Sequence, residues 1–155
     1  QPANFNSKEQ VAVSGEFKAV VKAVELAKQK GKKAGLLKVG GAFHSPLMLS
    51  AKIDLKPELD RLEFKKAQVP VVPNVTAKGT TNPEHIKELL IEQITKPVLW
   101  SRSLQFMSNQ GVTNFIEVGP GKVLQGLVKR TLAGVNISGV DRLSDLEVFL
   151  PSLSK

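Results

Sequence analysis

Short apolar runs alternate with stretches of helical periodicity along most of this sequence, and this alternation restricts the fold more than any other feature. Apolar residues that recur every three or four positions predict helices over 17–27, 55–62, 83–94, 100–107, 124–132 and 143–150. Shorter apolar runs predict strands over 10–14, 33–39, 69–75, 112–118 and 135–140. Strands that alternate with helices in this order predict an α/β fold with parallel strands.

Prolines set limits on three of these segments. Asn82 followed by Pro83 is typical of a helix N-cap and its first turn. Pro57 is compatible with a helix only near its first turn or at a kink. The two prolines inside 69–75 favour an edge strand or strand ends over a central strand, because proline donates no ladder hydrogen bond.

Composition describes one globular domain and excludes several kinds of site. The 155 residues are 41% hydrophobic and 23% charged, which is the profile of a soluble domain with a core. The absence of cysteine excludes disulfides, thiolate chemistry and cysteine-based metal sites, and two histidines without paired spacing argue against a zinc site. No apolar run reaches the roughly 18–20 residues of a membrane span. The chain starts without a methionine, so we expect a cut end, and targeting signals upstream of it would not be seen.

The formal charge of +8 favours an acidic partner. Sequence-specific nucleic-acid binding is disfavoured, because tyrosine is absent and arginines interleaved with stacking aromatics are missing. Six lysines crowd the first predicted helix and the turn after it: Lys18, Lys22, Lys28, Lys30, Lys32 and Lys33. They are either a solvated face or a surface that attracts an acidic partner.

His44 lies in the stretch GGAFHSPLM, residues 40–48, which the two glycines and a proline predict to be a shaped loop after a strand. It is either a hydrogen-bonded structural histidine or a general base. The adjacent Ser45 side chain points away from His44 in any extended conformation, so a base at His44 would need a nucleophile from elsewhere in the fold. Gln93 falls on the apolar stripe of its predicted helix, where a buried amide would need partners, or at its margin with the amide in water.

Two further features favour structural roles. The stretch GPGK at 119–122 lies between a strand and a helix but lacks the phosphate-loop and dinucleotide-binding patterns. A tight turn with close backbone packing is therefore the preferred interpretation. His85, near the start of a polar helix, is expected to be a solvated surface residue.

Five stretches in a fixed order carry a resemblance to one known family. They are NFNS at 4–7, GAFHSPLM at 41–48, VPVVPNVTA at 69–77, QITKPVLW at 93–100 and FIEVGPGKVL at 115–124. Together they resemble the C-terminal half of malonyl-CoA:acyl carrier protein transacylases, within the acyltransferase family of fatty acid and polyketide synthases.

The resemblance implies a serine–histidine transacylase of fatty acid biosynthesis. In that family a serine of a GHSxG elbow takes malonyl from coenzyme A and passes it to the phosphopantetheine thiol of acyl carrier protein. His44 would be the catalytic general base and acid, and the backbone carbonyl of Gln93 would orient its imidazole. Phe43, Asn6 and Asn74 match substrate-binding positions, and a phenylalanine just before the catalytic histidine accompanies malonyl rather than methylmalonyl use.

The same resemblance implies the fold and the partners. Residues 44–155 would be the C-terminal part of an α/β-hydrolase-like acyltransferase core, and residues 1–43 part of an incomplete ferredoxin-like small lobe. No cofactor and no metal are implied. The expected partners are malonyl-CoA, acyl carrier protein and the N-terminal half of the same enzyme, with no nucleic acid and no membrane. The expected location is the cytoplasm, or a plastid or mitochondrion if a transit peptide was removed upstream.

Three parts of the family's machinery do not occur in the sequence: the GHSxG serine, the glutamine of the oxyanion motif and the arginine that binds the malonyl carboxylate. The chain would accordingly be a fragment, a cleaved product or a degenerate relative. The alternatives to a fatty acid enzyme are a polyketide synthase acyltransferase domain and a non-catalytic fragment that binds carrier protein.

Overall fold

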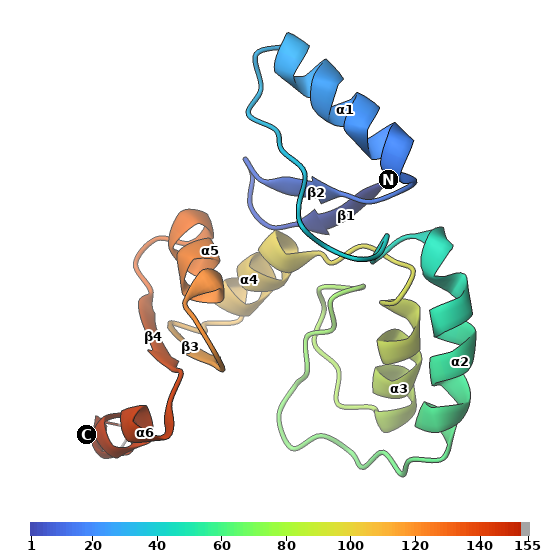
Figure 1. Ribbon diagram of the computed structural model, residues 1–155. Helices are drawn as coiled ribbons and strands as arrows, with labels where there is room; N and C mark the ends of the chain where they lie inside the picture. Colours follow the sequence, from blue (N-terminus) through green and yellow to red (C-terminus); the bar gives the residue numbers. More distant parts are fainter. Residues whose placement is uncertain (153–155) are drawn as a thin grey trace. The chain divides into compact units, whose positions relative to one another are not determined.

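The computed structural model describes residues 1–152 and divides them into two units, Gln1–Ser103 and a second unit that begins at Leu104. Helices and two small sheets make up the chain (Figure 1), which is a mixed α/β architecture. None of the described helices is both long and apolar enough to cross a membrane.

The first unit opens with an antiparallel hairpin. Strand β1 (Pro2–Phe5) pairs with β2 (Val11–Val13), and helix α1 (Phe17–Gln29) lies over the hairpin (Figure 1). The prediction of parallel strands is wrong for this sheet, because the link between the two strands is too short for a crossover. On its other edge β1 meets Val98, whose backbone N–H donates to Ala3 and whose carbonyl accepts from Phe5.

The segment after α1 is extended without being a strand. Helix α1 ends at Gln29, and Gly31 just after its C-cap has a φ of 69°, the left-handed conformation that glycine adopts most easily. Residues 33–39, predicted as a strand, have no ladder partner among the described residues, and the one backbone hydrogen bond described within the segment is a local one from Val39 to Leu37. The sequence has strand character there, but a strand forms only where another strand accepts its hydrogen bonds.

Two helices pack against each other after the His44 loop. A single 3₁₀ turn (η1, Pro46–Met48) leads into α2 (Leu49–Asp60), which lies beside α3 (Pro83–Glu92) (Figure 1). The predicted N-cap is confirmed, since the Asn82 side chain accepts from the backbone of His85. Pro57 lies in the last turn of α2, which excludes the first-turn position and leaves the other predicted alternative, a kink.

The predicted strand at 69–75 is wrong. Val71 and Thr80 exchange two backbone hydrogen bonds as an isolated bridge, and the chain then turns through Asn74 to Ala77. The prolines at 70 and 73 remove the donors that a longer ladder would need. Helix α4 (Trp100–Asn109) follows.

The second unit contains a strand–helix–strand motif. Strands β3 (Asn114–Val118) and β4 (Asn136–Val140) pair in parallel, and α5 (Val123–Thr131) connects them, as the alternation predicted. Helix α6 (Leu143–Ser152) follows. Leu127, Val128 and Val140 are buried in this unit, and Leu104 is fully buried.

Candidate functional site

The side chain of Ser45 braces the loop that carries His44. His44 has a φ of 60°, a left-handed backbone that costs a residue with a Cβ about 1–2 kcal/mol. The hydroxyl of Ser45, which is 1% exposed, donates to the carbonyl of Ala42 at 2.6 Å and accepts from the backbone of Leu47 at 3.3 Å. Ser45 is therefore a loop-bracing residue, and its hydroxyl does not point at the His44 ring.

The His44 imidazole is oriented by one backbone carbonyl. Its Nδ1 lies 2.7 Å from the carbonyl oxygen of Gln93. A carbonyl oxygen can only accept, so Nδ1 carries the hydrogen and donates it. In the neutral ring Nε2 is then left as an acceptor for a proton, which is the arrangement a general base requires.

The position of Gln93 explains why its carbonyl is available. Gln93 is the C-cap of α3, and the last carbonyls of a helix have no partner within the helix. The same end of the helix carries the partial negative charge of the helix dipole. The carbonyl is therefore free of intrahelical partners and can orient the His44 ring.

The Gln93 side chain is also held. Its Oε1 accepts from Nδ2 of Asn74 at 3.0 Å, and the carbonyl of Asn74 accepts from the backbone of Leu99 at 2.8 Å. Of the residues predicted for the site, the structure thus brings His44, Gln93 and Asn74 together from three distant stretches of sequence.

The other two predicted site residues, Phe43 and Asn6, have no described hydrogen bond to His44, Gln93 or Asn74. Phe43 is next to His44 and 50% exposed, with its ring so close to Gly41 that a Cβ there would lie 3.4 Å from Phe43 Cζ. Asn6 lies in the turn of the β1–β2 hairpin, where its backbone N–H donates to the carbonyl of Gln10. The described contacts connect Asn6 to the hairpin.

Three residues near the site were missed by the sequence analysis. The side chain of Gln1 donates to the carbonyls of His44 at 2.8 Å and Thr95 at 3.5 Å. Lys52 and Glu92 form an ion pair between α2 and α3. These are polar residues with ordinary spacing, and no sequence signal marks contacts that depend on long-range packing.

The GPGK stretch is a turn, as preferred from sequence, but for a different reason. Gly119 and Gly121 have φ values of 132° and 90°, and a Cβ at either would meet nothing within 4 Å. Glycine is needed at these two positions because of the backbone conformation of the turn, and the expectation of close backbone packing was wrong. Two of the first backbone amides of α5 have a partner within the chain, because the carboxylate of Glu117 accepts from Leu124 and Gln125 at 3.0 Å each. These hydrogen bonds, the one from Gln125 foremost, hold the pKa of Glu117 below its usual range.

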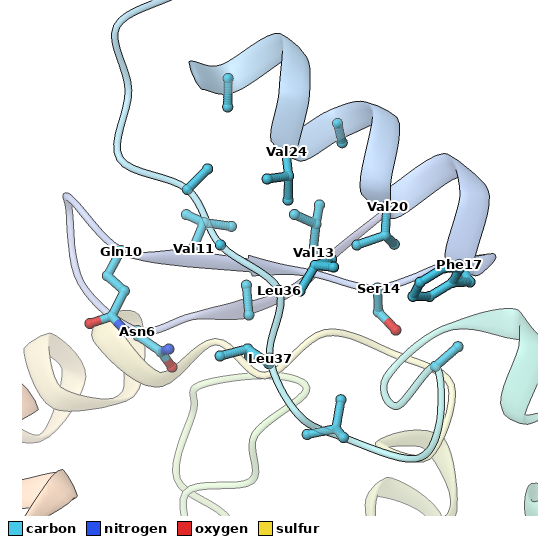
Figure 2. A pocket seen from close by; sticks show the side chains of 18 of the residues that line it. Asn6, Gln10, Val11, Val13, Ser14, Phe17, Val20, Val24, Leu36 and Leu37 are labelled. Carbon is cyan, nitrogen blue, oxygen red and sulfur yellow. The ribbon is translucent and has the colours of Figure 1, made fainter. Parts of the chain in front are cut away.

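A cavity of about 660 Å³ lies in the first unit between β2, α1 and the extended segment 33–39. Figure 2 shows Val11 and Val13 on the hairpin side and Val20 and Val24 on the helix side, with Leu36 on the extended segment that also lines the cavity. No residue of α1 is buried, so the apolar face of this helix is only partly covered. His85 is exposed, as expected, and among residues 1–152 no group of three or more acidic or histidine side chains could hold a metal ion.

Comparisons of this chain with family models, curated proteins and solved structures all find acyl transferases. The sequence model of the acyl transferase domain family matches residues 1–148. The malonyl CoA-acyl carrier protein transacylase of Bacillus subtilis (strain 168) is 43% identical over 100% of this chain and 49% of its own length. A crystal structure of the acyl-carrier-protein S-malonyltransferase of Bartonella henselae is 38% identical with a TM-score of 0.93, over 100% of this chain and 50% of that one.

A third relative is solved with a partner. A malonyl-transacylase in complex with its type II polyketide synthase acyl carrier protein is 37% identical with a TM-score of 0.90, over 98% of this chain and 50% of that one. The chain spans about half the length of each of these relatives.

Proposed function

Because this chain belongs to the acyl transferase domain family, we propose that it is the part of a malonyl-CoA:acyl carrier protein transacylase that supplies the general base and the carbonyl that orients it. The observation that carries the proposal is the hydrogen bond from His44 Nδ1 to the Gln93 carbonyl at 2.7 Å. The nucleophilic serine would come from the half of the protein that the relatives have and this chain does not span.

The reaction would proceed through a seryl ester. His44 Nε2 takes the proton of the serine hydroxyl as its oxygen attacks the malonyl thioester carbon, and the imidazolium returns that proton to the departing coenzyme A sulfur. The same exchange in reverse transfers malonyl to the thiol of acyl carrier protein. The helix-terminal carbonyl of Gln93 stabilises the imidazolium in both steps.

The rest of the protein would also complete the fold. We propose that residues 1–43, which include the hairpin, α1 and the segment 33–39, form an incomplete ferredoxin-like lobe. Residues 44–155 would belong to an α/β-hydrolase-like core. In the described chain β2 pairs with β1 along one edge only, and residues 33–39 face it across an apolar cavity. A strand from the other half, paired with both open edges, would fill this gap.

Substrate choice is proposed to depend on Phe43, the half-exposed ring next to His44. Malonyl would be preferred because the ring occupies the space of an α-methyl branch beside the acylated serine. Binding roles for Asn6 and Asn74 stay predictions. The six exposed lysines of α1 and the following turn would attract an acidic carrier protein and speed its association.

One alternative has support from a specific observation. The relative solved in complex with a type II polyketide synthase carrier protein leaves a role in polyketide rather than fatty acid synthesis open for this chain. Both roles use the same malonyl transfer. Location in the cytoplasm, a plastid or a mitochondrion stays a prediction.

The proposal is tested by His44→Ala in the complete protein. Transfer of malonyl should fall by about 10²–10⁴-fold, the usual contribution of a general base. The fold should survive, because His44 lies in a loop. The matched control is His85→Ala, which removes the other histidine of this chain from an exposed helix position and should leave turnover unchanged. A folded His44→Ala protein with normal turnover would disprove the assignment.

A further inference from the structure

The ion pair between Lys52 and Glu92 joins the two elements that meet at His44. Lys52 Nζ lies 2.5 Å from Glu92 Oε1, and each side chain is 23% exposed. Lys52 is in the first turn of α2, a short distance after the His44 loop, and Glu92 directly precedes Gln93. The pair therefore connects α2, the helix that follows the His44 loop, to the end of α3, where the Gln93 carbonyl accepts from His44.

Glu92 is held by a second cation. Lys96 Nζ lies 2.5 Å from its other oxygen, Oε2, and the two residues are four positions apart in the chain. The Lys52 hydrogen bond first, and then that of Lys96, hold the pKa of Glu92 below its usual range. Lys96 fixes the carboxylate to its own segment, so Lys52 is the only one of the two cations that reaches Glu92 from another helix.

Apolar packing alone anchors α2 weakly. No residue of α2 is buried, and Leu49 and Ile53 are 54% and 62% exposed. A helix with so little buried surface has a poorly defined position relative to its neighbour unless polar contacts set it. The distance from the His44 ring to the Gln93 carbonyl then depends on contacts that join α2 to α3.

We infer that Lys52 and Glu92 are positioning residues for His44, because their ion pair holds the start of α2 at the distance from the end of α3 at which Nδ1 of the imidazole reaches the Gln93 carbonyl. The pair acts through this hydrogen bond and so selects the tautomer with the hydrogen on Nδ1. The inference deepens the proposed function and rests on it for the catalytic meaning of His44. The contact itself is a property of this chain and can be measured without the reaction.

The direct test is the tautomer of His44 in this chain, read from imidazole ¹⁵N chemical shifts of histidine-labelled protein. His85→Gln in every sample leaves one histidine signal. At a pH where the ring is neutral, the original pair should show mainly the Nδ1–H form. Glu92→Gln and Lys52→Met should each raise the ratio of Nε2–H to Nδ1–H by about two- to fivefold, the factor that corresponds to a lost, partly exposed ion pair.

Three variants separate positioning from general stability. Lys52→Arg keeps the charge and should restore the original ratio. Lys56→Met breaks the Lys56–Asp60 pair on the same helix, where the side chains are 60% and 47% exposed, and should leave the ratio unchanged. If Glu92→Gln does not fold, Lys52→Met decides the question. Equal tautomer ratios in folded Lys52→Met and the original protein overturn the inference.

The complete protein gives the second readout. Lys52→Met should lower kcat for malonyl transfer about two- to fivefold, with KM for malonyl-CoA unchanged. A tautomer shift in this chain combined with no malonyl transfer by the complete protein would contradict the proposed function but not the positioning role. Active protein with an unshifted tautomer would contradict the positioning role alone.

Discussion

At the scale of single residues, the Phe43 ring is the feature most open to a test of substrate choice. It is half-exposed and rests against Gly41, where the absence of a side chain lets the ring approach the backbone. Phe43→Ser in the complete protein should raise the methylmalonyl-to-malonyl ratio of kcat/KM by about tenfold. The reason is that a hydrophobic site separates substrates by a single carbon with about 1–3 kcal/mol.

The control for Phe43 is Leu47→Ser. Leu47 is 54% exposed in the 3₁₀ turn of the same loop, so its loss removes a comparable apolar surface away from the residue next to His44. Steady-state kinetics with both thioesters should show a ratio near that of the original protein. If Phe43→Ser also leaves the ratio within about twofold, the ring does not select the substrate.

At the scale of an element, the start of α5 depends on one carboxylate from the preceding strand. Glu117 accepts from Leu124 and Gln125, and these bonds keep its pKa below the usual range. A lowered pKa in the folded state means that the stabilisation is present above the unfolded value of about 4.3 and is lost as the pH falls through the lower, folded value. Glu117→Gln should therefore accelerate hydrogen exchange of the first α5 amides at neutral pH.

The pH dependence provides the check on this prediction. The difference between Glu117→Gln and the original protein in thermal unfolding should shrink as the pH falls from the unfolded value of about 4.3 through the lower, folded pKa, because the original carboxylate takes up its proton over that range. Glu147→Gln removes the same charge from an exposed position on α6 and should leave α5 exchange unchanged. A difference that stays constant with pH would mean that shape rather than charge at Glu117 supports the helix.

At the scale of the whole molecule, the apolar cavity between β2, α1 and residues 33–39 is the place where the second half of the protein, under the proposed function, would bind. The proposed second half can be supplied as a separate fragment. The backbone amides of 11–13 and 33–39 should then exchange at about one tenth of their rate in the chain alone, or more slowly still, because each edge gains strand hydrogen bonds. Hydrogen exchange with mass spectrometry measures both segments at once.

Two substitutions on α1 make this prediction specific. Val24 lines the cavity, whereas Leu26 on the same helix does not and is 45% exposed. Val24→Lys should weaken association at least about tenfold, since a lysine in an apolar gap lacks a partner, and Leu26→Lys should leave it nearly unchanged. Equal affinities for the two variants would place the second half somewhere other than this cavity.

The sequence by itself determined the elements whose signals are local. The periodicity of 124–132, the glycine after α1 and the Asn82–Pro83 cap each depend on neighbours a few positions away, and the structure confirms them, with the helix at 123–131. The residues 33–39 and 69–75 failed as strands because pairing needs a partner that local sequence does not reveal. Family motifs singled out His44 and Gln93, although nothing in their spacing shows that they touch.

Only the tertiary structure decided how those two residues meet. The free carbonyl at the end of α3 reaches the imidazole because α2 and α3 pack side by side, and the residues that tie them, Lys52 and Glu92, are forty positions apart in the chain. Such contacts depend on the path of the backbone between the two residues. A lysine and a glutamate in sequence predict two solvated charges, whereas the folded chain makes them one contact beside the candidate base.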